Sequence, residues 1–336
     1  MKHSNIPIFI QHMGCPNQCV FCDQHTITGA HSFCEASVRS DIDAALATMG
    51  ERTCEIAYFG GSFTGIDRGQ MLRLLDLAQE YTERGAVCGI RLSTRPDYIS
   101  PEIVEILLHY PICAVELGIQ SMDDRVLTAC RRGHAAADTV QACALLRNAE
   151  IPFVGQMMTG LPGSDGQSEI ETAKRICSMG ASGARLYPCI VFQNTALADM
   201  TRKGLYSPLS VEEAVSRSSA VLEVFDAHGV PCLKIGLHDG QGLHDPDTYF
   251  AGPHHPALGE MVRSRVFLHK IEAVLQLVGS VREKHLQISV PPGCTSMAVG
   301  QKKENKLRIL EKTGAKSVKI LENKALCGYN ITIGVL

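Results

Sequence analysis

Three cysteines near the N-terminus have the types and spacing with the clearest chemistry. Cys15, Cys19 and Cys22 form a C-x3-C-x2-C run, and Phe21 stands directly before the third thiol. Thiolates are soft ligands that select iron–sulfur clusters or zinc. Three thiolates are one fewer than the set that closes a four-iron cluster, so a cluster held here would keep one iron open for chemistry. A structural zinc site would need a fourth ligand, for which His25 is the best local candidate.

Length and composition are those of a globular enzyme. The chain has 336 residues with 30 glycines, 10 phenylalanines, no tryptophan and a net charge of −3, which argues against disorder and against a surface built to coat a polyanion. The N-terminus lacks an apolar signal core, and no apolar run is long enough to span a bilayer. We expect a cytoplasmic protein without a membrane partner. The other eleven cysteines contain no second close pair, so we expect most of them to be small buried residues.

Short β-rich runs alternate with longer helical patterns, which is typical of βα units around a parallel sheet. The clearest helices are expected at Asp67–Arg84 and Val211–His228, where apolar residues recur at helical spacing. Six or seven units are fewer than the eight of a closed barrel. The sequence therefore predicts an α/β fold, an open partial TIM barrel of the (β/α)6 type. The strands are expected at Ile6–His12, Glu55–Phe59, Gly89–Ser93, Ala114–Gly118, Phe153–Thr159, Ala184–Tyr187 and Cys232–Ile235.

The pattern changes near Pro253, so we expect a barrel domain over residues 1–252 and a small α+β appendage over 253–336. The appendage should contain a long helix, a shorter Lys-rich helix and three strands. These are expected at Leu258–Val278, Lys302–Thr313, Leu286–Val290, Ser317–Leu321 and Tyr329–Val335. From residue 301 onward there are eight Lys or Arg and three Glu, so this tail carries +5. Lys302, Lys303, Lys306 and Lys312 could engage phosphates, or the helix could simply present a solvated face.

Several polar motifs follow predicted strands, and ligands of barrels and open sheets bind at that end of the strands. After the second strand comes Gly60-Gly61-Ser62-Phe63-Thr64, in which two glycines would let the backbone approach a ligand. Arg95 follows the third strand and could grip a carboxylate bidentately, or form a surface salt bridge.

Polar residues also close the fourth strand. Glu116, Gln120 and Ser121 suit ribose hydroxyls, and equally suit capping of the following helix. Of the thirteen histidines, His254 and His255 lie between prolines, and we interpret this segment as a rigid turn in preference to a metal site. His134 is a weaker candidate for an acid or a substrate contact, and could also be solvated.

With these motifs placed, the chain resembles the radical S-adenosylmethionine (SAM) enzymes, and within them the radical SAM half of the Elongator catalytic subunit family, which modifies wobble uridines of tRNA. The cysteine run with Phe21 is the signature of the superfamily. The likeness to the Elongator family extends from about Cys15 to Ala214. It rests on motifs in the same order: Gly60-Gly61-Ser62-Phe63, Thr94-Arg95-Pro96-Asp97-Tyr98, Glu116-Leu117-Gly118-Ile119-Gln120-Ser121, Arg132-Gly133-His134, Met157-Met158 through Leu161-Pro162, and Leu186-Tyr187-Pro188.

The resemblance implies which residues hold the cofactors. Cys15, Cys19 and Cys22 would ligate a 4Fe–4S cluster, and Phe21 would pack near the adenine of SAM. The strand-end loops would supply the remaining SAM contacts. Gly60, Gly61 and Ser62 would hold the methionine amino group, and Phe63 and Thr64 belong to the same loop. Arg95 and Gln120 would face the methionyl or ribose part, and the backbone near Tyr187 would meet the adenine.

Three features depart from that family. Three residues separate the first two cysteines, where the family has a longer gap, and Arg185 stands where the family often has Lys. The chain ends at Leu336, so no acetyltransferase domain is expected to follow the barrel. The resemblance therefore carries the class of chemistry and not the full uridine carboxymethylation.

The implied mechanism starts with an external electron donor of flavodoxin or ferredoxin type, which reduces the cluster. SAM is then cleaved into methionine and a 5′-deoxyadenosyl radical, which abstracts hydrogen from a substrate at the barrel mouth. A base in tRNA is the leading substrate. One alternative is a small molecule, as in the oxygen-independent porphyrinogen oxidases. Another is a non-catalytic metal-binding scaffold.

Overall fold

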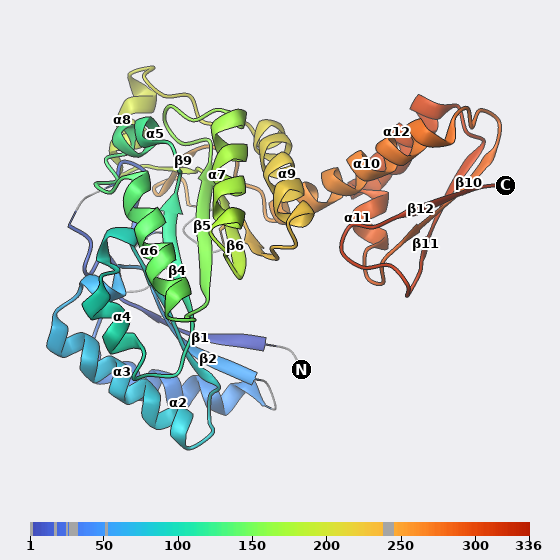
Figure 1. Cartoon of the computed structure of the whole chain (residues 1–336). Helices are drawn as coiled ribbons and strands as arrows, with labels where there is room; N and C mark the ends of the chain where they lie inside the picture. The colour runs from blue at the N-terminus through green and yellow to red at the C-terminus, as the bar shows by residue number, and fades with distance from the viewer. Residues whose placement is uncertain (1–2, 17–18, 25, 27–32, 51–52, 238–244) are drawn as a thin grey trace.

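The computed structural model describes residues 3–16, 19–24, 26, 33–50, 53–237 and 245–336. Its main feature is a curled sheet of seven parallel strands in which neighbours along the chain pair in order (Figure 1). The sheet confirms the predicted open partial barrel, with one strand beyond the six of the (β/α)6 unit. In sheet order, the strands are β1 (His3–Phe9), β2 (Thr53–Phe59), β3 (Gly89–Thr94), β4 (Ile112–Gln120), β5 (Phe153–Thr159), β6 (Gly183–Pro188) and β8 (Cys232–Ile235).

Helices connect the strands and pack along the outside of the curled sheet (Figure 1). Two of the predicted helices are found within one residue of their expected ends, because side chains mark where they begin. Asp67 accepts a hydrogen bond from Gln70 N at the start of α3, and Ser210 forms a capping box with Glu213 at the start of α9. The helices are α2 (Val38–Met49), α3 (Arg68–Glu83), α4 (Pro101–Leu107), α5 (Asp124–Ala129), α6 (Ala136–Asn148), α7 (Gly166–Ser178), α8 (Ala196–Arg202) and α9 (Val211–Ala227).

One face of the sheet is buried against helices, while β3, β5 and β6 alternate buried with half-buried residues along their length. In β2 all five central residues are buried, and Tyr58 donates a hydrogen bond from its hydroxyl to Leu74 O of α3. On α3 the apolar stripe Met71, Leu74, Leu75 and Ala78 is buried against this sheet. The buried residues of the strands and the helical stripe therefore form the barrel core.

Several element ends differ from the sequence prediction, and the Lys-rich helix begins at Glu304 rather than Lys302. β1 ends at Phe9 rather than His12, because the chain turns at Ile10–Met13, where Met13 N donates to Ile10 O and His12 has a φ of +55°. A short antiparallel pair, β7 (Val191–Phe192) with β9 (Tyr249–Ala251), was not predicted. Strands of two or three residues give too short a pattern to detect.

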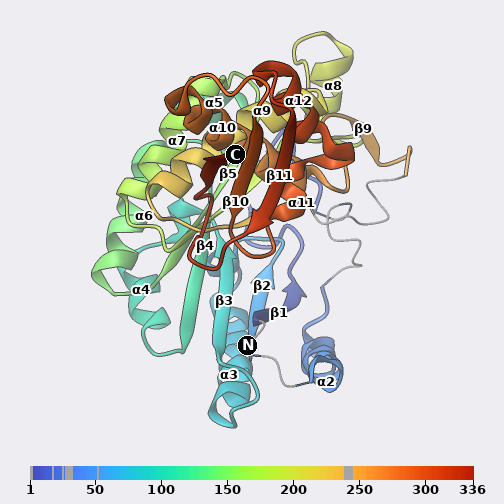
Figure 2. The same ribbon diagram turned by 90° about the vertical axis from the view of Figure 1, so that its right-hand side faces the viewer.

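The C-terminal appendage has its own three-stranded sheet (Figures 1 and 2). The predicted helix α10 (Leu258–Val278) is found with the expected bounds, and its two halves pack into different apolar clusters, Val262 with the barrel and Ile271 with the appendage. The proposed domain boundary at 252/253 stays a prediction. The remaining elements are β10 (His285–Val290), α11 (Thr295–Val299), α12 (Glu304–Thr313), β11 (Ser317–Glu322) and β12 (Thr332–Val335). Among the described residues no helix is long and apolar enough to cross a membrane.

Candidate active site

The three cysteines lie on the loop that leaves β1 at the carboxyl edge of the sheet. Cys19 is buried, and Cys15 and Cys22 are half-buried. Backbone turns shape the loop, since Cys15 N donates to His12 O and Cys22 N donates to Cys19 O. Val20 N donates to Cys130 O, which ties the loop to the segment after α5.

The sequence left two metals open for the three sulfurs, a four-iron cluster and a single zinc ion. In a tetrahedral zinc site with Zn–S bonds of about 2.3 Å, the sulfurs lie about 3.8 Å apart. Within the described ranges, the one group of three metal-ligating side chains whose ligand atoms lie within 4.8 Å of one another is not in the cysteine loop. The three thiols of this loop are therefore not held in the close set of a tetrahedral zinc site. His25, the candidate fourth zinc ligand, lies outside the described residues.

Each sulfur has a polar partner of its own. Cys15 Sγ lies 3.4 Å from the hydroxyl of Ser62, and Gln24 Nε2 donates to Cys22 Sγ at 3.6 Å. Arg132 Nη1 donates to Cys19 Sγ at 3.4 Å, in a buried contact. Hydrogen bonds and a nearby positive charge stabilise thiolates, so these partners suit sulfurs that ligate a metal cluster.

Burial, and next the neighbouring Cys19, raises the pKa of the Cys22 thiol to about 12. Before a metal binds, this thiol is therefore protonated near neutral pH. Because the metal ligand is the thiolate, binding a cluster must release this proton.

The Gly60–Ser62 loop packs directly against the cysteine loop. A side chain at Gly61 would lie 2.5 Å from the backbone oxygens of Ile10 and Met13, and Ser62 N donates to Met13 O at 2.8 Å. The absence of a side chain at Gly61 is thus required by the contact between the loops. The predicted contact of this loop with the methionine amino group stays a prediction.

The side chains of the next two residues, Phe63 and Thr64, are buried in the protein interior. Phe63 is fully buried and stacks on Tyr58 with ring centroids 4.6 Å apart. The hydroxyl of Thr64 donates to Tyr98 O at 2.9 Å and lies 2.7 Å from that of Thr94. Their side chains hold the loop in place, so a contact of either residue with SAM would have to use the backbone.

Arg95 forms the expected bidentate carboxylate contact, but with a carboxylate of the chain itself. Its Nε and Nη2 donate to the two oxygens of Asp97 at 2.9 and 2.7 Å, and its Nη1 donates to Arg132 O at 2.7 Å. Only 1% of Arg95 is exposed, which excludes a surface salt bridge. The geometry makes it a residue that positions Arg132.

Arg132 is the residue of this site that the sequence analysis missed. Besides Cys19 Sγ, its guanidinium donates to Gly118 O at 2.7 Å. Its sequence signal is the Arg131-Arg132-Gly133-His134 run, in which His134 was the candidate for an acid or a substrate contact. That histidine is buried rather than solvated, and burial, followed by the charge of Arg132, lowers its pKa to about 3. It is therefore neutral at physiological pH.

Gln120 is the last residue of β4 and has an unusual backbone for a non-glycine residue, with a φ of +65°. Its Oε1 is buried and has no hydrogen-bond partner among the described residues. A buried acceptor without a partner calls for one, and a SAM hydroxyl or ammonium would supply it. Ser121 does not cap α5 itself, because Asp123 is the N-cap and accepts from Arg125 N, but the Ser121 hydroxyl accepts from Asp123 N in the turn before the helix.

A charged network crosses the inside of the barrel. The buried carboxylate of Glu116 on β4 accepts hydrogen bonds from Arg185 Nη2 on β6 and Gln156 Nε2 on β5, both at 2.7 Å. On the other side Arg91 of β3 lies between Glu116 and Glu55. Tyr187, whose backbone is predicted to meet the adenine, follows Arg185 on β6, and burial raises its pKa.

Among the residues that the structure describes, one compact group of three metal-ligating side chains is found, and it lies at the opposite end of the sheet. Glu55, Cys88 and Cys113 come from the amino-terminal ends of β2, β3 and β4. Arg91 Nε donates to Glu55 at 2.6 Å, and burial raises the pKa of Cys113 to about 12. An arginine on the carboxylate and protonated thiols favour a structural role there.

Comparison with known proteins agrees with this geometry. The profile of the radical SAM superfamily matches residues 10–176, and that of the radical SAM C-terminal domain matches residues 181–267. The chain belongs to the radical SAM superfamily. A radical SAM enzyme accounts for the three-cysteine loop at the carboxyl edge of an open barrel, and the family implies a 4Fe–4S cluster and SAM.

Similar proteins include tRNA-modifying enzymes. A tRNA uridine(34) acetyltransferase of Methanocaldococcus jannaschii is 33% identical over 127 residues, which are 37% of this chain and 24% of that protein. The structure of an archaeal Elp3 from Methanocaldococcus infernus superposes with a TM-score of 0.60 at 22% identity, over 78% of this chain and 62% of that one. An uncharacterized protein of M. jannaschii is 27% identical over 66% of this chain and 72% of its own length. The chain thus spans about a quarter of the acetyltransferase that it matches.

Proposed function

We propose that this radical SAM enzyme acts on a nucleotide base in tRNA. The observation that carries the proposal is the 33% identity to tRNA uridine(34) acetyltransferases, over 127 residues in one archaeal protein and 146 in another. The matched segments are parts of those proteins, so acetyl transfer is not included in the proposal. The class of reaction proposed is abstraction of hydrogen from a carbon of the base or its substituent.

In this proposal Cys15, Cys19 and Cys22 hold the cluster, and the unpartnered Gln120 Oε1 contacts SAM. When bound, the cluster supplies the electron that cleaves SAM and starts radical chemistry. The remaining SAM contacts that we propose are made by the strand-end loops, through Phe21, Gly60, Gly61, Ser62, the backbone of Phe63 and Thr64, and Tyr187. An external electron donor of flavodoxin or ferredoxin type is proposed as the reductant.

The surrounding residues orient the site and keep it dry. Arg132 places a positive charge at Cys19, and Arg95 with Asp97 fixes the backbone of Arg132. Phe21 packs on an apolar cluster that includes Val20. These contacts exclude water from the buried side of the cysteine loop, as radical chemistry requires.

A small-molecule substrate is the second candidate. The radical SAM enzyme coproporphyrinogen III oxidase of Escherichia coli superposes with a TM-score of 0.50 at 15% identity, over 68% of this chain and 53% of that one. Identity that low supports a common fold alone. The tRNA proposal is favoured because the tRNA-modifying relatives named above are 33% identical over their matched segments.

The test is anaerobic turnover of the reconstituted full chain with SAM, a chemical reductant and unmodified tRNA. We expect 5′-deoxyadenosine, measured by mass spectrometry, to rise when tRNA is added and to acquire deuterium from base-deuterated tRNA. Cys19→Ala should abolish the product, whereas Cys327→Ala, at an exposed cysteine of the appendage, should not. Product that forms at the same rate with and without tRNA, and without deuterium, would overturn the tRNA proposal.

A further inference from the structure

The C-terminal appendage contains a strand–helix–turn–helix–strand unit. β10 leads into α11, a four-residue turn joins α11 to α12, and β11 returns parallel to β10 and beside it. The turn is Gly300-Gln301-Lys302-Lys303. KH modules, which bind single-stranded nucleic acid, use a G-x-x-G loop to clamp the backbone of about four nucleotides. The turn here has the first glycine of that pattern and Lys303 at the fourth position.

The backbone of the turn is unusual for its residues. Gly300 has a φ of +80°, and Lys302 and Lys303 have φ values of +49° and +66°. The left-handed region is readily adopted by glycine and seldom by lysine. Left-handed non-glycine residues persist where the surroundings fix them, and they concentrate at functional sites. Lys303 thus holds a backbone conformation that glycine adopts freely, and it adds a positive charge.

A buried asparagine fixes the turn against the long helix α10. Asn305 is 4% exposed, and its Nδ2 donates to Ser264 O at 3.0 Å and lies 2.9 Å from Ser264 Oγ. A side chain at Gly300 would lie 2.9 Å from Asn305 N. The turn is therefore already held in one shape before any ligand binds, which lowers the entropy cost of binding.

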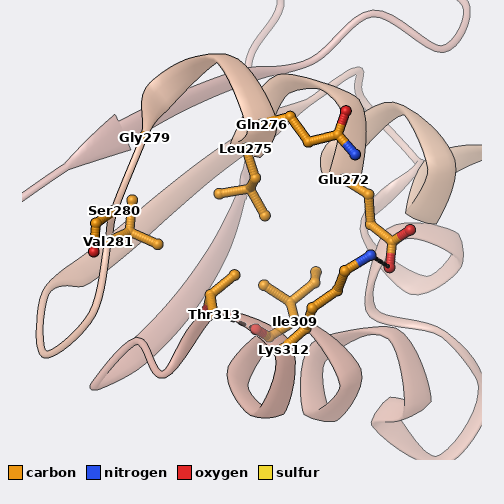
Figure 3. Close-up of a pocket in the computed structure, with 9 residues that line it drawn as sticks. All are labelled: Glu272, Leu275, Gln276, Gly279, Ser280, Val281, Ile309, Lys312 and Thr313. Carbon is orange, nitrogen blue, oxygen red and sulfur yellow. Dashed lines mark hydrogen bonds and ion pairs between the residues drawn. The ribbon is translucent and has the colours of Figure 1, made fainter.

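The lysines of the turn are free to bind an anion. Lys302 and Lys303 are exposed and Lys306 is half-buried, and within the described residues none of the three forms an ion pair. Lys312 differs, because its Nζ lies 3.3 Å from Glu272 on the wall of a pocket of about 260 Å³ between α10 and α12 (Figure 3). The phosphate role predicted for Lys312 is therefore less favoured than that of the three lysines near the turn.

We propose that the Gly300–Lys303 turn binds the sugar–phosphate backbone of an unpaired RNA strand, with phosphates on Lys302 and Lys303. The identification of the strand as RNA rests on the proposed function. The appendage would then hold an unpaired segment of the tRNA while the barrel acts on a base. A short turn with two adjacent charges fits one strand, whereas duplex RNA is recognised across two successive minor grooves.

The test measures binding of the full chain to a fluorescently labelled, unstructured RNA by anisotropy, with a duplex RNA as competitor. Lys302→Gln with Lys303→Gln removes two contacts. For single strands log K falls with log salt by about 0.7 per phosphate contact, so the slope should become shallower by about 1.4. By the same relation, affinity at about 0.1 M salt should fall on the order of 25-fold.

The matched control removes the same charge from the other end of the unit. Lys284→Gln with Lys316→Gln changes two exposed lysines that lie about one length of α12 away, near the start of β10, and should leave affinity and slope unchanged. Lys303→Gly should weaken binding while raising the melting temperature, because it relieves the left-handed lysine. Weaker RNA binding in a variant with a higher melting temperature must come from the lost lysine contact, because the variant is not less stable.

Three results would overturn the inference: no binding of the unpaired RNA, equal effects of the two double variants, or a preference for the duplex. Binding is measured without cluster or SAM, so it stands apart from turnover. RNA binding at the turn without tRNA-dependent turnover would support the inference and refute the proposed function. tRNA-dependent turnover that does not change when Lys302 and Lys303 are replaced would support the proposed function and refute the inference.

Discussion

Replacing Arg132 by glutamine should lower the reduction potential of the cluster. Arg132 Nη1 lies 3.4 Å from Cys19 Sγ in a buried contact. Reduction adds negative charge to the cluster, and a neighbouring positive charge stabilises that state. Charge and hydrogen bonds to the sulfurs are among the factors that set iron–sulfur potentials.

The size of the effect can be worked from this contact. Two unit charges 3.4 Å apart interact by about 5 kcal/mol at an effective dielectric constant of about 20. The added electron is spread over a cluster that extends beyond the sulfur, so about half of that energy, 2–3 kcal/mol, should be lost. For one electron, about 1.4 kcal/mol corresponds to about 59 mV. The potential of Arg132→Gln should therefore be about 100 mV more negative than that of the wild type.

The assay is a redox titration of the reconstituted protein, followed by the electron paramagnetic resonance signal of the reduced cluster. Arg131→Gln is the matched control, because it removes the same charge from the adjacent, exposed residue, which has no ion pair among the described residues. It should shift the potential by far less, since solvent screens an exposed charge. Equal potentials for wild type, Arg131→Gln and Arg132→Gln at full iron content would refute the reasoning.

Two further predictions concern stability. Gly61→Ala should lower the free energy of unfolding by about 1–3 kcal/mol and lower the iron content, because its methyl group would lie 2.5 Å from two backbone oxygens of the cysteine loop. Calorimetry and iron assays measure both effects. The control Gly166→Ala, whose methyl group would meet nothing within 4 Å, should behave like the wild type. His134, with its pKa near 3 in the fold and an ordinary value of 6.5, should contribute stability fully above pH 6.5 and lose it as pH falls toward 3, by about 1.4 kcal/mol per pH unit. Urea unfolding of the metal-free protein from pH 7 to 4 should show that slope, His134→Asn should remove it, and exposed His228→Asn should not; an unchanged slope in His134→Asn would contradict the assignment.

The barrel could be predicted from the sequence because short β-rich runs alternate with amphipathic helices. β5 and β8 have the predicted bounds, and the other barrel strands differ at their ends, where turns decide the boundary. The cysteines were recognised from spacing alone. The pair β7 and β9 could not be predicted, because each strand is two or three residues long and the partners lie far apart in sequence.

The polar partners in the site were harder to predict, since they depend on which side chains meet. Arg95 was expected to contact the methionyl or ribose part of SAM; its guanidinium pairs with Asp97, two residues away, and the contact with SAM stays a prediction. Arg132 was missed because its contact with Cys19 joins residues 113 positions apart. Gln120 was expected to face SAM, and its unpartnered Oε1 supports that expectation without testing it.

The cysteine loop owes its environment to the barrel rather than to its own residues. Gln24 belongs to the loop, but Ser62 follows β2 and Arg132 follows α5. The positive charge at Cys19 is thus present only once the ends of β1, β2 and β4 are brought to one edge of the sheet. A peptide with the same three cysteines would offer the same ligands without that charge. If the three cysteines hold the cluster as proposed, the fold would contribute to its potential as well as to its position, and the titration of Arg132→Gln measures that contribution.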